Sequence, residues 1–245
     1  MECVMKYKRI LLKLSGEGLS NKKKSLLIDY EIVKNIAIQL QKIHKQGYEV
    51  AIVVGGGNFW RGESASKNGI PRTRADYIGM LATTMNALAL QSGFESVGLK
   101  ARVQSSLSID GKVAENYITE KAKHYLSNGE IVIFAGGTGR PFFTTDTAAT
   151  LVASEMQCDV LLMAKNGVNG VYDADPKVSP SAIKFDSLSY DELLHIVLTN
   201  GLKIMDSTSV TMAKENNIKI LVFDIQEKDS ILKVLEGNAE HTKVE

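Results

Sequence analysis

The sequence has little of what marks disulfide-rich, zinc-binding or nucleic-acid-binding proteins. Its two cysteines, Cys3 and Cys158, form no CxxC pattern and its four histidines stand apart, so neither a disulfide framework nor a zinc site is indicated. Lys and Arg total 29 and Asp and Glu total 28, a net charge of +1. The chain therefore lacks the overall basic field of a nucleic-acid binder, while local anion sites are compatible with it.

Long apolar runs are also missing. None approaches the roughly 18 residues that a membrane helix needs, and the N-terminal segment lacks the apolar core of a signal peptide. We therefore expect a cytoplasmic protein with no membrane contact. At 245 residues the chain can bury one sizeable core, and we expect one domain over residues 1–245.

Short apolar runs alternate with helical patterns along the whole chain. The runs that indicate buried strands are Ile10–Leu14, Val50–Val54, Ile131–Ala135, Val160–Ala164 and Ile218–Phe223. Helices are expected over 29–46, 74–92 and 145–157, and after the capping box Ser189–Glu192. This alternation predicts an α/β fold, a three-layer αβα sandwich with a central, mostly parallel sheet.

Two local features predict breaks in this pattern. Gly93 is expected to end the helix that begins at residue 74. Residues 94–112 interrupt the alternation of strands and helices, and we predict a β-hairpin there with its turn at Asp110–Gly111.

Four loops rich in Gly, Thr or Asp follow strand signals. They are KLSGEG (13–18), GGGNFWRG (55–62), GGTGRPFFTTD (136–146) and AKNGVNGVYDADP (164–176). Ligands of open α/β sheets bind beyond the carboxyl ends of the strands, so these loops are expected to converge on one crevice. Backbone amides of glycines can come close to phosphate because no Cβ intervenes.

Two familiar phosphate motifs do not fit these loops. The Walker pattern fails because Gly62 is followed by Glu63, an anion, where the motif requires a lysine. The dinucleotide fingerprint fails because Trp60 takes its third glycine position. Glycine-rich turns alone are weak evidence, so the charged residues beside them decide the interpretation.

Three cations stand at the ends of three strands. Lys13 lies inside an apolar run, where it is costly unless its ammonium reaches an anion or water, and Arg61 and Lys165 follow two further strands. Thr144, Thr145 and Asp146 open a helix whose N-terminus can bind an anion, and Asp146 can orient the lysines or magnesium. Each of these is ordinary surface charge or capping when taken alone; together they indicate a phosphate site.

This set of charges suits phosphoryl transfer between two phosphate-bearing molecules. Repulsion between unit charges about 5 Å apart is roughly 3 kcal/mol at an effective dielectric of 20, so fixed cations and a metal must offset it. An acceptor phosphate is already anionic at neutral pH and needs no general base. The sequence shows no convincing His/Asp or Cys/His arrangement, in agreement with such a reaction.

The motifs resemble those of a known family over nearly the whole chain. KLSGEG, GGGNFWRG, ADYIGMLATTMNALAL, GGTGRPFFTTDTAA, NGVNGVYDADP and KIMDSTS occur in the order and approximate spacing of bacterial uridylate kinases, members of the amino acid kinase superfamily. The resemblance implies an amino acid kinase-like fold, transfer of the ATP γ-phosphoryl group to UMP with Mg²⁺ carried by ATP, and a homohexamer. It also implies that UMP binds mainly to residues up to about 155 and ATP mainly to the C-terminal part.

The resemblance assigns roles to individual residues. Lys13, Arg61 and Asp146 are expected to be catalytic. The expected ATP contacts are Lys13, Leu14, Ser15, Gly16, Gly57, Arg61, Lys165, Asn166, Tyr172 and Asp175. The expected UMP contacts are Gly56, Asp76, Thr138, Gly139, Arg140, Pro141, Phe142, Phe143, Thr144 and Thr145.

The sequence departs from the family pattern at two places, and two other functions fit the same scaffold. Arg140 replaces a usual asparagine, and the loop SNKKKSLLID differs from the glycine-rich loop of relatives that GTP activates, which argues against that activation here. Inhibition by UTP cannot be read from these residues. The same scaffold could serve a carboxylate or carbamate kinase, or a non-catalytic nucleotide sensor.

Overall fold

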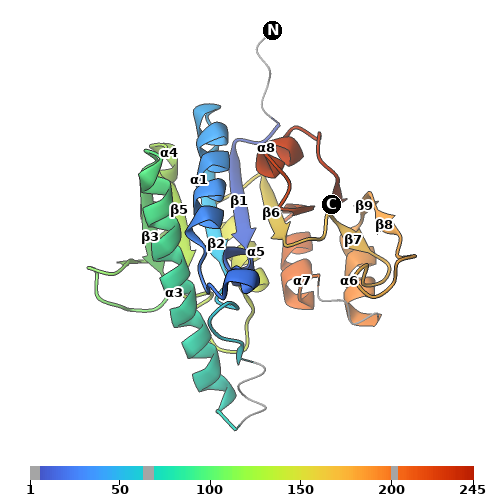
Figure 1. The fold of residues 1–245 in the computed structure, drawn as a ribbon, viewed down its shortest axis with the longest axis horizontal. Coiled ribbons are helices and arrows are strands. Elements are labelled where there is room, and N and C mark those ends of the chain that lie inside the picture. The colour runs from blue at the N-terminus through green and yellow to red at the C-terminus, as the bar shows by residue number, and fades with distance from the viewer. Residues whose placement is uncertain (1–5, 63–68, 200–203) are drawn as a thin grey trace.

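A nine-stranded sheet forms the centre of the computed structural model, which describes residues 6–62, 69–199 and 204–245 (Figure 1). Its strands, in chain order, are β1 (Arg9–Leu14), β2 (Glu49–Val54), β3 (Ala101–Ser105), β4 (Glu115–Asn116), β5 (Ile131–Ala135), β6 (Val160–Lys165), β9 (Ser187–Leu188), β10 (Lys219–Asp224) and β11 (His241–Val244). They lie in the order β4-β3-β5-β2-β1-β6-β10-β11-β9. A separate two-stranded sheet joins β7 (Val171–Tyr172) and β8 (Lys184–Phe185).

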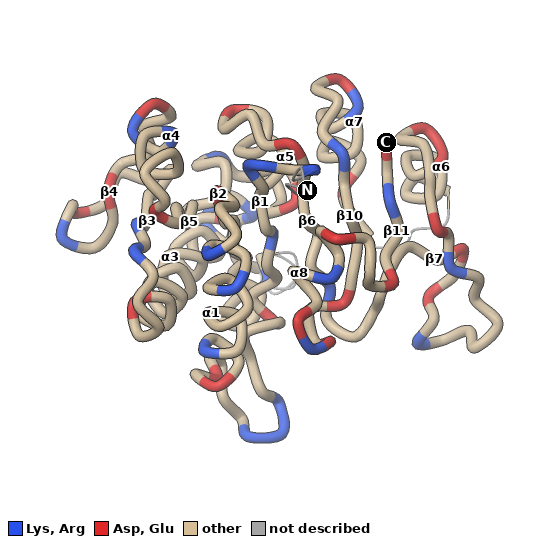
Figure 2. The backbone as a smooth tube through the Cα atoms, turned by 90° about the horizontal axis from the view of Figure 1, so that it is seen from above, with Lys and Arg blue, Asp and Glu red and all other residues tan. Residues whose placement is uncertain are grey.

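Helices cover both faces of the sheet. They are α1 (Tyr30–Lys45), α3 (Arg72–Ser96), α4 (Thr119–Ser127), α5 (Thr145–Glu155), α6 (Tyr190–Thr199), α7 (Ser207–Glu215) and α8 (Ser230–Leu235), with 3₁₀ turns η1 (Gly16–Leu19) and η2 (Lys22–Lys24). Figure 2 shows α1, α3 and α8 on one side of the strands and α4, α5, α6 and α7 on the other. Each helical layer buries its own apolar cluster against the sheet. The predicted αβα sandwich is confirmed.

The sheet is mostly parallel, as predicted, and β1 lies near its centre. β1 pairs in parallel with β2 and β6, and Lys13 is aligned with Val53 on one side and Met163 on the other. Among the pairings of the large sheet, only that of β11 with β10 is antiparallel in the part of the chain described. The carboxyl ends of β1, β2, β5 and β6 therefore meet at one edge.

Local capping signals in the sequence begin helices where they were expected. Asp29 accepts a hydrogen bond from the Glu31 amide at the start of α1. Ser189 and Glu192 form a reciprocal capping box before α6, with an amide-to-side-chain bond in each direction. Because these caps satisfy amides that a helix leaves free, the beginning of each helix is set by nearby sequence.

The predicted β-hairpin over 94–112 is wrong. Ala101–Ser105 is instead a strand that pairs in parallel with β5, and its far neighbour β4 is also parallel to it. The turn itself forms, since the Val113 amide donates to the Asp110 carbonyl at 2.8 Å. The turn lies in the crossover from β3 to β4. The apolar positions of β3 are buried because this strand joins the parallel sheet beside β5.

Gly93 does not end its helix, because it serves helix packing instead. α3 continues to Ser96, and Gly93 faces α1 where a Cβ would lie 2.3 Å from the Val33 Cγ1. The glycine therefore lets two long helices approach each other over the sheet. This close approach depends on a contact 60 residues away along the chain, which local sequence signals do not carry.

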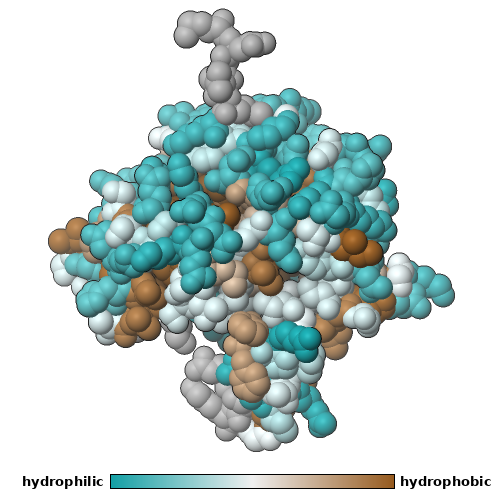
Figure 3. All heavy atoms as spheres, turned by 180° about the vertical axis from the view of Figure 1, so that it is seen from behind, coloured by the Kyte–Doolittle hydropathy of each residue, from teal (hydrophilic) through white to brown (hydrophobic). Residues whose placement is uncertain are grey.

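The face of the molecule opposite to that of Figure 1 is largely polar. Figure 3, a view of the face opposite to that of Figure 1, shows mostly hydrophilic residues with separate hydrophobic patches. In residues 6–62, 69–199 and 204–245, none of the helices combines the length and the apolar character required to cross a bilayer. Cys158 is buried and unpaired, whereas Cys3 lies outside the described residues.

Replacing Gly93 with alanine is expected to destabilise the protein. The added methyl group overlaps the buried Val33 side chain, and overpacking of this kind costs about 1–3 kcal/mol. Urea unfolding measures the loss. The double variant Gly93→Ala with Val33→Ala should lose less stability than the sum of the two single changes; strict additivity would contradict the packing role.

Candidate active site

The loops after three central strands, β1, β2 and β5, line one cavity of about 410 Å³ at the carboxyl edge of the sheet, together with α3. Figure 1 shows the arrowheads of β1 and β6 pointing to this end of the molecule. Predicted site residues that line the cavity are Lys13, Ser15, Gly16, Gly56, Gly57, Arg61, Asp76, Thr138, Phe143, Thr144 and Thr145. Residues 130 positions apart in the chain therefore share one cavity. Three of the four predicted loops line it, whereas the loop 164–176 lines a separate, smaller cavity, so the prediction that all four converge on one crevice is wrong.

Lys13 and Asp146 form an ion pair behind this cavity. The Lys13 Nζ and the Asp146 Oδ1 lie 2.6 Å apart, and the whole Lys13 residue is 8% exposed. Burial opposes ionisation of Asp146, but the charges of Lys13 and Lys165 outweigh it and hold the pKa of this carboxyl below its usual value. Asp146 is thus an anion that pairs with Lys13 at the end of β1 and interacts through its charge with Lys165 at the end of β6.

Lys165 completes this group of three charges. Burial, reinforced by the charge of Lys13 and opposed by that of Asp146, lowers the pKa of Lys165 to about 8. Its ammonium donates to the Ile204 carbonyl. With two cations and one anion the cluster carries net positive charge at neutral pH, which favours phosphate groups in the space beside it.

Glycines let the first two loops pack directly against each other. A Cβ on Gly16 would lie 2.7 Å from the Gly55 carbonyl oxygen and 2.8 Å from the Gly57 amide nitrogen. A Cβ on Gly56 would lie 2.6 Å from the Gly79 carbonyl oxygen of α3. Side chains at these positions would push the two backbones apart, so the glycines permit both loops to face the same cavity.

Arg61 lies at the mouth of the cavity and is bonded to the other loop. Its guanidinium donates to the Glu17 carboxylate, with the Nε at 3.1 Å. Both side chains are substantially exposed, so this pair is a weak one that an incoming anion can replace. Arg61 therefore joins the loops 13–18 and 55–62 while keeping its charge available.

Asp76 connects α3 to the loop 136–146. The Arg72 Nε donates to both carboxylate oxygens of Asp76, at 2.8 and 2.9 Å, and the Phe142 amide donates to Oδ2 at 2.8 Å. The Asp76 side chain is 11% exposed. This carboxylate lines the cavity, and these three hydrogen bonds hold it in a fixed orientation. A carboxylate fixed in this way can accept a hydrogen bond from a ligand hydroxyl.

A smaller cavity of about 200 Å³ lies next to Lys165. Lys165, Tyr172 and Asp175 line it together with Pro176 and Ile204. Asn166, expected in the same group, lines a different cavity between α1 and the segment after β10. The structure thus brings together three of the four residues assigned to the C-terminal nucleotide site and separates Asn166 from them.

The other predicted contacts lie around the main cavity. Leu14 is 2% exposed and belongs to the apolar core, so only its backbone can serve a ligand. Gly139 and Arg140 line a neighbouring depression beside Ser106 and Tyr117. Pro141 is partly exposed, and Phe142 is 65% exposed and has a φ of 73°. The loop thus turns sharply between the two phenylalanines.

Several polar residues that support the site were missed by the sequence analysis. The Thr144 and Thr147 hydroxyls donate to the Asp206 carboxylate, which also caps α7 by accepting from the Ser209 amide at 3.0 Å. The Thr83 hydroxyl accepts from the Gly136 amide at 2.7 Å. The position of Asp206 directly before the helical run gave a capping signal, whereas its bonds to α5 had no local signal.

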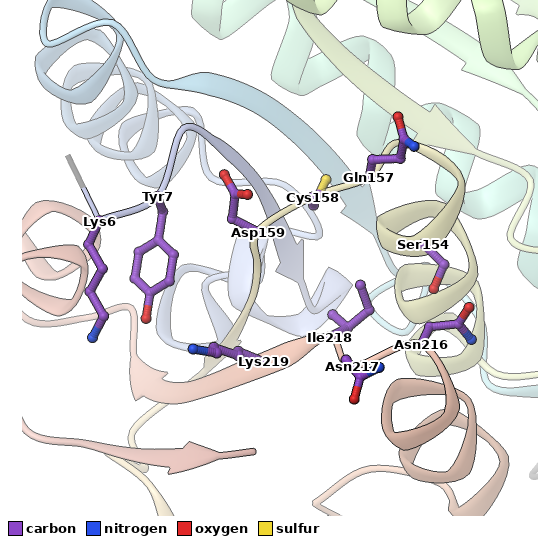
Figure 4. Close-up of a pocket in the computed structure, with 10 residues that line it drawn as sticks. All are labelled: Lys6, Tyr7, Ser154, Gln157, Cys158, Asp159, Asn216, Asn217, Ile218 and Lys219. Carbon is purple, nitrogen blue, oxygen red and sulfur yellow. The ribbon is translucent and has the colours of Figure 1, made fainter. Parts of the chain in front are cut away.

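A larger cavity of about 510 Å³ lies at the opposite edge of the sheet (Figure 4). None of its described lining residues belongs to the predicted site. Ser154 and Gln157 lie at the end of α5, and Asn216 and Asn217 lie just after α7. Two cations, Lys6 and Lys219, also line this cavity, but in the described part of the chain none of the four glycine-rich loops reaches it.

The fold is that of an α/β protein with a cavity at the carboxyl edge of its sheet, lined by Lys13 and by glycine-rich loops, and the chain belongs to the amino acid kinase family, whose model matches residues 8–224. It is 66% identical to the uridylate kinase of Mycoplasmopsis pulmonis (strain UAB CTIP), over 97% of this chain and 96% of that protein. It is 63% identical to the uridylate kinase of Mycoplasmopsis synoviae (strain 53), over 98% and 99% of the two chains.

Solved structures give the same relationship. The UMP kinase from Ureaplasma parvum superimposes with a TM-score of 0.89 at 38% identity, covering 98% of this chain and 99% of that one. The UMP kinase from Bacillus anthracis gives the same TM-score and identity, covering 97% and 96%.

Replacing Asp146 with asparagine is expected to lower the pKa of Lys165 further below about 8. Burial and the Lys13 charge would then disfavour the ammonium without an opposing anion. Titration of the lysine ¹³Cε resonances by NMR measures this shift, and a constant or raised pKa would contradict the three-charge arrangement.

The lowered pKa of Lys165 also gives stability a definite pH dependence. Between about pH 8 and the usual lysine value of 10.5 the unfolded chain binds more protons than the folded one. The contribution of Lys165 to the free energy of unfolding is therefore highest above pH 10.5, where this group is neutral in both states. It decreases as the pH falls through this window, and the loss is complete below about pH 8.

Proposed function

We propose that this protein is a UMP kinase that transfers the γ-phosphoryl group of ATP to UMP, giving UDP and ADP. The observation that carries the proposal is the single cavity in which Lys13, the two glycine loops and Asp76 meet. The names of its relatives, at up to 66% identity over nearly the whole chain, support UMP as the acceptor.

The acceptor nucleotide is proposed to occupy the part of the cavity lined by α3 and the loop 136–146. Asp76 is suited to accept hydrogen bonds from ribose hydroxyls, and Gly56 offers its backbone to the phosphate. The exposed rings of Phe142 and Phe143 provide apolar surface for the base. Thr138, Gly139, Arg140, Pro141, Thr144 and Thr145 are the remaining proposed UMP contacts.

The donor nucleotide is proposed to extend from the main cavity to the smaller one beside Lys165. Its phosphates would lie against the backbone of Leu14, Ser15, Gly16 and Gly57, and its adenosine near Tyr172 and Asp175. Asn166 would require the nucleotide to reach a separate cavity, so its assignment is the least supported. In this proposal residues up to about 155 mainly bind UMP, and the rest mainly bind ATP.

The chain's own residues act by placing charge. Lys13 stabilises the negative charge of the phosphoryl group as it passes from donor to acceptor, and Lys165 adds positive charge on the donor side. Arg61 reduces the repulsion between the two phosphates at the mouth of the cavity, and Asp146 keeps both lysines oriented. An acceptor phosphate needs no general base, so alignment and charge neutralisation are the work left to the protein.

Mg²⁺ is proposed to enter with the ATP phosphates. In the part of the chain described, no three His, Cys, Asp or Glu side chains gather into a set that could hold a metal ion. Asp146, paired with Lys13, is the carboxylate that would lie beside such an ion. When bound, the ion would supply positive charge that offsets the negative charge of the phosphates.

Self-association is also proposed, with a homohexamer as the expected form. Tyr77, Leu81 and Met85 follow one another at i, i+4 and i+8 on α3 and are 43, 49 and 47% exposed. Apolar side chains at this spacing share one helix face, which suits a contact with a second copy. The cytoplasm, where nucleotides are made and used, is the proposed compartment.

ADP release in the presence of ATP and Mg²⁺ should be stimulated by UMP far more than by CMP, aspartate, glutamate or carbamate. A coupled ADP assay with all five acceptors side by side measures this. Stimulation by a carboxylate or carbamate alone would favour the acyl-phosphate-forming alternative, and nucleotide binding without turnover would favour a sensor. Either result would overturn the proposed function.

Lys13→Ala and Asp76→Asn are expected to separate turnover from binding. Loss of the Lys13 charge should lower kcat by about 100-fold or more while the KM for UMP changes little, because this charge acts on the moving phosphoryl group. Asp76→Asn should mainly raise the KM for UMP and leave ATP binding intact. Steady-state kinetics with each substrate varied in turn measure both, and a selective ATP defect in Asp76→Asn would contradict its assignment.

A further inference from the structure

We propose that Asn58 and Asn86 act as a pair of positioning residues that fix the distance between the loop 15–18 and the loop 55–62. The proposal rests on the proposed function, in which these two loops hold the donor and acceptor phosphates. Neither asparagine lines the phosphate cavity, so both would act through the loops that do.

The two side-chain amides bond to each other in both directions. The Asn86 Nδ2 donates to the Asn58 Oδ1 at 2.8 Å, and the Asn58 Nδ2 donates to the Asn86 Oδ1 at 3.0 Å. Each Nδ2 makes a second bond, from Asn86 to the Gly55 carbonyl at 2.7 Å and from Asn58 to the Leu27 carbonyl at 2.8 Å. Asn86 is fully buried within α3. A buried amide is strongly unfavourable unless it is paired, so this network has one preferred geometry.

The pair connects four segments of the chain: α3, the loop 55–62, the segment before α1 and the loop 15–18. Asn86 anchors the start of the glycine loop to α3 through Gly55, and Asn58 anchors the same loop to the segment before α1 through Leu27. The loop 15–18 packs directly on the pair, since a Cβ on Gly16 would lie 2.4 Å from the Asn58 Oδ1. The amide oxygen of Asn58 therefore adds a side-chain contact to the backbone contacts with Gly55 and Gly57 that limit how closely the first loop approaches the second.

The asparagine pair should affect phosphoryl transfer more than the binding of either nucleotide. Each loop keeps its own backbone groups and cations when the amide pair is lost, so each nucleotide can still be held separately. The reacting phosphorus and oxygen must approach to near-contact distance, and a misplacement of about 1 Å can cost on the order of 100-fold in rate. A change in loop spacing should therefore lower kcat and leave the separate affinities nearly unchanged.

The kinetic test compares Asn86→Leu and Asn58→Ala with a matched control. Gln91→Leu is the control, because Gln91 also donates from α3 to a backbone carbonyl, that of Ala101, away from both loops. Both asparagine variants should lose about 10- to 100-fold in kcat with KM values for UMP and ATP within about threefold of the parent, and the control should keep its kcat. Asn58 lies on a partly exposed loop, so Asn58→Ala is testable even if Asn86→Leu fails to fold.

A second measurement reads the loop without any activity. Trp60, the single tryptophan of the chain, lies in the loop 55–62, where its Nε1 donates to the Ala75 carbonyl at 2.9 Å. Its fluorescence emission should shift to longer wavelength in both asparagine variants and stay constant in Gln91→Leu. This readout keeps its meaning if the parent protein fails to phosphorylate UMP, so failure of the positioning role and failure of the proposed function are distinguishable.

A bisubstrate ligand sharpens the distinction for the active enzyme. Uridine and adenosine joined by a chain of phosphates should bind at least about 10-fold more weakly to Asn58→Ala than to the parent, while UMP and an unreactive ATP analogue each bind as before. Calorimetry measures all three. Parent-like kcat and parent-like Trp60 emission in folded Asn58→Ala, or a raised KM with kcat unchanged, would overturn the proposal.

Discussion

The ion pair between Lys13 and Asp146 is the interaction on which the rest of the site depends. Lys13 is carried by a central strand and is 8% exposed, and a buried ammonium without a partner would cost several kcal/mol. Asp146 supplies the partner from the first turn of α5, whose apolar residues pack against the same sheet. The fold therefore brings the two charges together, and Lys165 leaves the group with a net positive charge directed at the carboxyl edge.

The close approach of the surrounding loops follows from the absence of side chains and the presence of a few buried polar groups. Gly16 and Gly55 let two turns come into direct backbone contact. Thr83 holds the Gly136 amide, and Asp206 holds both the start of α5 and the start of α7. These polar contacts are buried or half-buried and paired, so the loops are held in one arrangement before any ligand arrives. This is the condition that phosphoryl transfer by alignment requires.

Sequence patterns predicted the elements and the location of the site, because both depend on nearby residues. Apolar runs gave the five central strands, capping residues gave the starts of α1 and α6, and glycine loops after strands gave the crevice. The hairpin over 94–112 was wrong because a short apolar segment can satisfy either a local antiparallel partner or a distant parallel one. Gly93 was misassigned as a helix stop for the same reason: its role is set by Val33, across the helix interface.

The supporting residues had no signal that local reasoning could use. Asn58 and Asn86 are 28 residues apart, and Thr147 and Asp206 are 59 apart, so their bonds exist only once α3, α5 and α7 have packed. Thr138 to Thr145 were placed at the site as one continuous segment, yet the structure divides them between the main cavity and a neighbouring depression. The class of chemistry could thus be predicted from charge and glycine content, but the cavity that each individual residue lines could not.

A crystal structure with UMP and an unreactive ATP analogue bound together tests the central claim most directly. The account predicts both phosphate chains at the carboxyl edge of β1 and β2, with the γ-phosphorus and a UMP phosphate oxygen facing each other beside Lys13. Nucleotides bound on separate faces of the sheet, or a UMP phosphate far from Lys13 with Asp146 still paired to it, would contradict the account.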